Sequence, residues 1–141
     1  MDYEAFNSKL TTDAVGLCFL FTLLLISAII MLFVVKRQFD DSKISRITMY
    51  ILCVFLIIVC ICNIVSISYE THYDISNHAY IEYEGKFYVD YFKSSGDNHI
   101  TLYDENGTIV KYPAGRAESG EHEGRIIYAE KSRRAFVVEV D

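Results

Sequence analysis

The sequence predicts a membrane α-helical hairpin of two transmembrane helices, followed by a small all-β antiparallel domain of about six strands. Two apolar runs, residues 14–35 and 47–67, contain 22 and 21 residues and no charge. Only eleven residues separate them. From residue 78 onward, apolar and polar side chains alternate with a period of two, which is typical of half-buried strands. The β domain is therefore expected over residues 78–141, barrel-like or as a compact sandwich.

Each apolar run is long enough to cross a bilayer as a helix. At about 1.5 Å per residue the two runs would rise about 33 and 32 Å, against a hydrocarbon core of roughly 30 Å. Fifteen residues of the first run are Leu, Ile, Val or Phe, whose insertion into lipid is favourable. A soluble chain of this size has too little other apolar surface to bury two such helices. The lipid bilayer is therefore an expected partner.

The loop between the runs, residues 36–46, determines the expected orientation. Its basic residues are Lys36, Arg37, Lys43 and Arg46. Basic residues near spans favour the cytoplasmic side, so the loop is expected there and both termini outside the cytoplasm, in the plasma membrane. Residues 1–13 have neither the basic start nor the cleavage site of a signal peptide, and form a short outer segment. Residues 68–77 are expected to be a tether.

Three polar or sulfur-containing side chains are predicted near one depth in the hairpin. Counted from the outer ends of the spans, Cys18, Cys62 and Asn63 lie within about 2 Å of each other in depth. Asn63 would bond across the helix pair, or the two cysteines would approach each other. The alternative is that these side chains face lipid unpaired. All four cysteines lie in the apolar runs, so the β domain has no disulfide framework and no thiolate metal site.

Three hairpins with odd-numbered loops keep the core face of the predicted sheet apolar. A loop at 83–85 sets Ile81 opposite Phe87, with Gly85 in the left-handed position. A loop at 105–107 sets Leu102 opposite Val110 in the same way. The last loop, 131–133, sets Tyr128 opposite Phe136.

Charge and aromatic content indicate what the β domain binds. Residues 69–141 carry fourteen acidic and eight basic side chains, which argues against nucleic acid and anionic lipid. Nine of the eleven tyrosines lie here. Exposed tyrosine is common interface material, although tyrosine also simply suits strands. The candidate interaction residues are three tyrosines on the face opposite the predicted core, Tyr80, Tyr88 and Tyr103, and three nearby carboxylates, Glu82, Asp90 and Asp104. Such a surface would favour a basic protein partner.

The sequence offers little for catalysis, and no cofactor is expected. Glu121, His122 and Glu123 are the most concentrated set of potential ligands, but they lie in a glycine-flanked loop, residues 113–124, that does not organise a metal site. There is no nucleophile elbow and no phosphate-binding glycine loop. Asn106 begins an Asn-Gly-Thr glycosylation pattern on a predicted turn, which matters only in a host that glycosylates.

These observations favour a non-enzymatic integral membrane protein that presents an acidic, tyrosine-rich β domain at the outer membrane surface for protein–protein interaction, as an accessory, assembly or regulatory subunit. One specific version is an immunity-type protein that neutralises a toxin at the membrane. A second possibility is a cytoplasmic membrane-tethered adaptor with inverted topology, and a third is an enzyme whose site lies in residues 113–124. The hairpin is either only an anchor or itself a binding surface.

Overall fold

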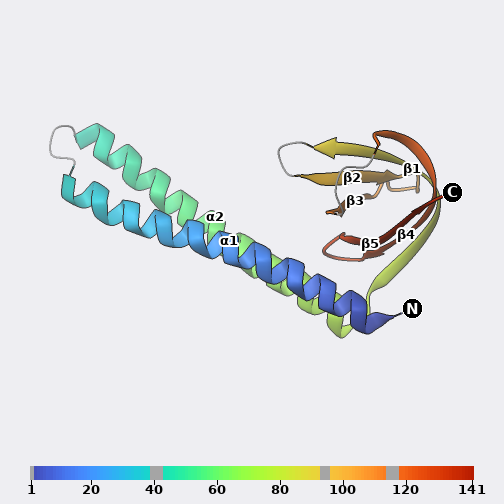
Figure 1. Ribbon diagram of the computed structural model, residues 1–141. Coiled ribbons are helices and arrows are strands. Elements are labelled where there is room, and N and C mark those ends of the chain that lie inside the picture. Colours follow the sequence, from blue (N-terminus) through green and yellow to red (C-terminus); the bar gives the residue numbers. More distant parts are fainter. Residues whose placement is uncertain (1, 39–42, 93–95, 114–117) are drawn as a thin grey trace. The chain divides into compact units, whose positions relative to one another are not determined.

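The structure, a computed structural model, describes residues 2–38, 43–92, 96–113 and 118–141. These residues form two long helices and one antiparallel sheet (Figure 1), which confirms the predicted fold class. α1 spans Tyr3–Gln38 and α2 spans Lys43–Ser76. Both helices are long and apolar enough to cross a membrane, and only 11% of the apolar window in each is buried. A core helix of a soluble protein would be mostly buried.

Both helices extend well beyond the predicted spans. The segment 1–13, expected to be a short outer segment, is helical from Tyr3, and the expected tether 68–77 is helical through Ser76. Asp2 caps the start of α1, because its Oδ1 accepts the N–H of Ala5 at 3.2 Å. Hydropathy alone missed these ends because they contain several polar and charged residues. The two basic pairs of the predicted loop lie in the end turns of α1 and α2, and residues 39–42 lie outside the described part of the chain.

The least exposed side chains of the hairpin follow a heptad pattern. Along α1 they alternate in steps of four and three, and α2 repeats this spacing from Cys53. Such a 3.5-residue repeat is typical of left-handed coiled-coil packing. Small residues stand at its most buried positions, since Ala28 and Cys60 are each only 1% exposed. We call this set the heptad seam: Ala14, Cys18, Phe21, Leu25, Ala28, Leu32, Val35, Cys53, Ile57, Cys60, Ile64 and Ile67.

The β domain is a five-stranded, nearly closed barrel in the described residues. Its strands are β1 (Tyr80–Phe92), β2 (Asp97–Leu102), β3 (Ile109–Tyr112), β4 (Gly120–Ala129) and β5 (Ala135–Val140), in the order β3-β2-β1-β4-β5. A parallel bridge between Lys111 and Arg134 brings the two edge strands together. A partly open barrel of five strands is the architecture of OB-folds, which support many unrelated functions.

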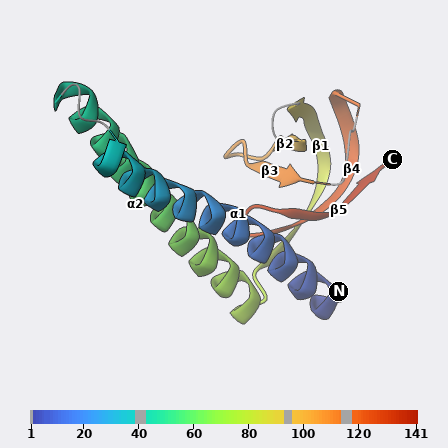
Figure 2. The same cartoon turned by 60° about the vertical axis from the view of Figure 1, so that its left-hand side comes forward.

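The first predicted hairpin is wrong, because β1 is one continuous strand. It runs through Gly85 without a turn and pairs with both β2 and β4. Gly85 has φ +147° and lies opposite Gly124, while the Tyr83 hydroxyl folds over it and donates to the carbonyl of Lys86 at 2.7 Å. Figure 2 shows β1 and β4 as long, curved neighbours. The glycine therefore permits a bend in a shared strand, and this merger reduces six predicted strands to five.

The second hairpin keeps its predicted faces in a shifted register, whereas the last one keeps them at Ile126 and Val138 but not at Phe136. Ile100 pairs with Val110, two residues away from the predicted register, because the β2–β3 loop is longer than three residues. Gly107 is left-handed as expected, with φ +59°. In the last hairpin, Ile126 pairs with Val138 as predicted, but a bulge at 127/128 sets Tyr128 opposite Ala135 instead of Phe136.

The barrel core and the helix ends belong to one compact unit. Residues 1–10 and 70–141 form this unit, and residues 11–69 form another. Inside the barrel, the buried cluster is Phe87, Val89, Ile100, Leu102, Val110, Ile126, Tyr128 and Ala135. A second cluster joins α1 to the strands, where Leu10 packs with Ala129 and Phe136. Both helix ends are thus part of the β domain's own fold, which no sequence pattern indicated.

Candidate interaction surfaces of the β domain

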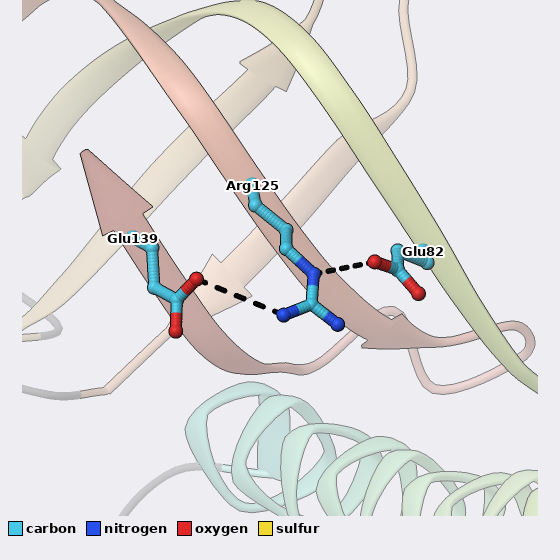
Figure 3. Close-up of polar contacts among 3 residues, drawn as sticks. All are labelled: Glu82, Arg125 and Glu139. Atoms are coloured by element: carbon cyan, nitrogen blue, oxygen red, sulfur yellow. Dashed lines mark hydrogen bonds and ion pairs between the residues drawn. The ribbon is translucent and has the colours of Figure 1, made fainter. Parts of the chain in front are cut away.

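The outer face of β1, β4 and β5 carries a network of acidic and basic side chains. Strand register aligns Glu84 with Arg125 and Arg125 with Glu139. The Arg125 guanidinium bonds Glu82 through Nε and approaches Glu139 at 3.8 Å (Figure 3), and the bond to Glu82 raises the pKa of Arg125. Because all three side chains are at least 41% exposed, the network contributes little to stability. Glu82 therefore lies on the surface as predicted, but with a cation already beside it.

Two of the three predicted interface tyrosines lie near each other on the surface. Tyr88 is 40% exposed and Tyr103 is 50% exposed. Tyr88 pairs with Glu121 across the β1–β4 ladder, and the Tyr103 hydroxyl donates to Glu121 Oε1 at 3.0 Å. This hydrogen bond is the main cause that raises the pKa of Tyr103. We call Tyr88, Tyr103 and Glu121 the tyrosine patch; the sequence had placed Glu121 in an irregular loop instead.

Tyr80 does not belong to the tyrosine patch. Its ring packs against Phe6 and Phe136, and its hydroxyl donates to Asn7 Oδ1 at 2.5 Å. Burial, with the charge of Asp74 second, raises the pKa of Tyr80. The prediction of an exposed Tyr80 is wrong because the first turns of α1 cover this end of β1.

The two predicted aspartates have different surroundings. Asp90 is exposed on β1, where it pairs with His99 of β2. Asp104 organises the β2–β3 loop, because its carboxylate accepts the N–H of Thr108 at 2.8 Å and the hydroxyl of Thr108 at 2.5 Å. Asp104 is therefore a turn residue, and only Asp90 is available at the surface for a partner.

Replacing Thr108 by Val tests the role of Asp104. The Thr108 hydroxyl is the first cause that lowers the pKa of Asp104, so Thr108→Val is expected to raise this pKa towards its ordinary value. A carboxyl group whose pKa is lower in the folded chain stabilises the fold at pH values above its unfolded pKa, and this stabilisation is lost as the pH falls through the folded pKa. The stability of the variant should therefore depend less on pH in the acid range. An NMR titration of the Asp104 carboxyl measures this, and an unchanged pKa would contradict it.

A cavity lies on the open side of the barrel, and the sequence did not indicate it. Its volume is about 300 Å³, at the lower end of the range for ligand sites, roughly 300–1,000 Å³. The lining is mostly apolar and comes from all five strands and the segment before β4: Val89, Asn98, Ile100, Tyr112, Glu118, His122, Val138 and Val140. Asn98 is fully buried and donates to the carbonyl of Tyr112 at 3.3 Å. We call this space the barrel cavity.

The residues singled out for the enzyme alternative are separated by the pleat of β4. Glu121 faces outward to Tyr103, and Glu123 lies opposite Lys86. His122 instead lines the barrel cavity, and its Nε2 lies 2.9 Å from the carbonyl of Glu118. Within the described ranges, no group of three or more His, Cys, Asp or Glu could hold a metal ion. The three side chains therefore do not converge on one point, and residues 114–117 lie outside the description.

The hairpin residues expected to meet do not meet. Cys18 Sγ lies 3.9 Å from the hydroxyl of Ser68 rather than near Cys62, which is exposed. Asn63 donates to the carbonyl of Val59 in its own helix at 2.8 Å. The reason is helix rotation, since the heptad seam turns Cys53 and Cys60 inward and Cys62 away.

The chain has no match among family models, curated proteins or solved structures.

Proposed function

We propose that this chain is a non-enzymatic integral membrane protein whose β domain binds a basic protein partner at the outer surface of the plasma membrane. The observation that carries the proposal is the tyrosine patch. Tyrosine supplies large and rigid contact area at little entropic cost, and the surrounding carboxylates steer a basic partner. A tyrosine hydroxyl already held by Glu121 is also preorganised for binding.

The proposed orientation rests on the four basic residues at the closed end of the hairpin. Lys36 and Arg37 end α1, and Lys43 and Arg46 begin α2. A protease cleaving a tag placed after Asp141 in intact cells tests it. Cleavage is expected, whereas full protection would place the β domain in the cytoplasm and favour the adaptor alternative.

Site-specific photocrosslinking tests the binding surface. Benzoylphenylalanine in place of Tyr88 or Tyr103 is expected to give one adduct of defined mass in membranes, and the attached protein should be basic. Benzoylphenylalanine at Glu130, which is exposed in the β4–β5 hairpin, is the control and should give no such adduct. Equal adducts from all three positions, or none from the tyrosine positions, would overturn the proposed surface.

A further inference from the structure

β5 is an edge strand of the described sheet. On one side β5 pairs with β4 along its length. On the other side β3 reaches it only through the Lys111–Arg134 bridge, where Lys111 N–H donates to the carbonyl of Arg133 at 2.9 Å. Because β3 ends at Tyr112, no strand in the described ranges pairs with this edge further along β5. An unpaired edge is a template for another strand.

Two residues of β5 direct their peptide groups to this open edge. Asp141 N–H donates to the carbonyl of Glu123, so Asp141 faces β4. The main-chain N–H and C=O groups of successive residues point to alternate sides of a strand. Those of Glu139 therefore also point to β4, while those of Val138 and Val140 point away from β4. Nearer the start of β5, Lys9 Nζ donates to the carbonyl of Phe136 at 3.5 Å. The open edge therefore begins after Phe136, and we define it as Val138–Val140.

The barrel cavity lies directly beside the open edge. The side chains of Val138 and Val140 line it together with Ile100 and Tyr112. On the opposite face of β5, Glu139 points outward to Arg125. One strand thus offers outward main-chain groups and an apolar space on its inner face.

We propose that the open edge binds an extended segment of the partner protein, which adds as a strand beside β5 and inserts an apolar side chain into the barrel cavity. This rests on the proposed function and names the binding mode. Residues paired across two strands point to the same face, so a partner residue opposite Val138 or Val140 points into the cavity. The partner residues before and after this apolar residue point to the opposite face, where Glu139 lies, and we propose that they are basic.

Two other occupants fit these observations less well. A small apolar ligand would fill the barrel cavity but leave the main-chain groups of Val138 and Val140 unpaired. A second copy of the chain would bring like charges together, because Glu139 and Asp141 of both copies would lie near the joint edge. The net charge of the chain is −6, which opposes self-association further.

Hydrogen exchange of the full chain in zwitterionic micelles tests whether the edge is open. We expect the amides of Val138 and Val140 to exchange at least about 100-fold faster than those of Glu139 and Asp141, because the latter pair with β4. Equal protection of all four amides would mean that the chain covers its own edge and would overturn the proposal. Protection that grows with protein concentration would identify a second copy and also overturn it.

A designed peptide tests the pattern of the partner segment. The probe is the acetylated and amidated heptapeptide Lys-Val-Lys-Leu-Lys-Val-Lys, titrated to millimolar concentration against the full chain and followed by NMR. Binding should protect the Val138 and Val140 amides. Replacing the central Leu by Asp, or each Lys by Glu, should weaken binding at least about tenfold. Absence of binding, or equal binding of all three peptides, would overturn the proposal.

N-methylated peptides separate strand addition from simple charge attraction. Methylation of the main-chain amide nitrogens of the Lys residues and methylation of those of the Val and Leu residues change opposite edges of the same peptide. If the peptide adds as a strand, only one of the two sets faces β5, so only one should abolish binding. Tolerance of both methylated peptides would overturn the strand mode.

Val140→Pro tests the edge on the protein itself. Proline removes the outward N–H of Val140 and leaves the bond from Asp141 to β4 in place. Peptide binding should fall at least about tenfold, while thermal melting of the β domain stays unchanged. Glu130→Ala, an exposed substitution outside the tyrosine patch and the open edge, is the control and should keep peptide binding.

Crosslinking in the Val140→Pro background separates this inference from the proposed function. The adduct yield through Tyr103 should fall if the partner uses the open edge. An undiminished yield would overturn the edge proposal and leave the proposed function standing. Absence of the Tyr103 adduct when Val140 is unchanged would count against the proposed function alone.

Discussion

Asp74→Ala is expected to destabilise the β domain by about 3 kcal/mol, because one buried carboxylate holds the β4–β5 hairpin. Asp74 is fully buried near the end of α2. Its Oδ1 accepts the N–H of Lys131 and its Oδ2 accepts the N–H of Ser132, both at 2.9 Å. Removing the side chain leaves two main-chain donors without a partner. Thermal unfolding of the full chain in micelles, followed by near-UV circular dichroism of the tyrosines, measures the loss.

A series at this position separates hydrogen bonding from charge. Asp74→Asn keeps one acceptor oxygen and should lose about half as much stability as Asp74→Ala. Glu130→Ala removes an exposed carboxylate from the same hairpin and should change the melting temperature little. Equal effects of Asp74→Ala and Glu130→Ala would show that the helix end does not hold the hairpin through these bonds.

Gly124→Ala is expected to destabilise the domain by about 3 kcal/mol, because it forces β4 and β5 apart. A Cβ at Gly124 would lie 1.9 Å from the carbonyl oxygen of Glu139 and 3.0 Å from the Cα of Val140. Both contacts are with backbone, so no side-chain rotation relieves them. Hydrogen exchange should show lost protection at Asp141, whose N–H pairs with Glu123.

Gly16→Ala is the matched control for Gly124→Ala. Gly16 lies in α1, and a Cβ there meets nothing within 4 Å. The β domain should melt as in the unmodified chain, since alanine also favours a helix over glycine. If Gly124→Ala melts as Gly16→Ala does, the strands are not in close contact at Gly124.

Local pattern was sufficient wherever one face of an element decides its structure. The two uncharged runs predicted the helices, and period-two alternation predicted the strands. In the β2–β3 hairpin the odd loop predicted the inward face correctly although the register slipped by two, because a shift of two keeps every side chain on its face. The last hairpin kept its predicted pairing only up to the bulge, with Ile126 opposite Val138.

Pattern failed where a residue has two possible roles. Gly85 lies at a sequence position typical of a turn, but in the structure it allows β1 to bend. Only the pairing of β1 with β4 decides between a turn and a bend at this glycine. Tyr80 alternates like an exposed residue but is covered by Phe6, more than seventy positions away. The barrel cavity escaped notice because its lining comes from all five strands and the segment before β4.

The sequence by itself determined the two apolar helices, the acidic and tyrosine-rich β domain and the basic closed end of the hairpin, because hydropathy, charge and alternation are local properties. Only the tertiary structure decided that the helix ends belong to the β domain, that Asp74 holds the last hairpin and that β5 is an edge strand of the described sheet beside a cavity. These features depend on contacts between residues far apart in the chain, and no short window of sequence contains both partners.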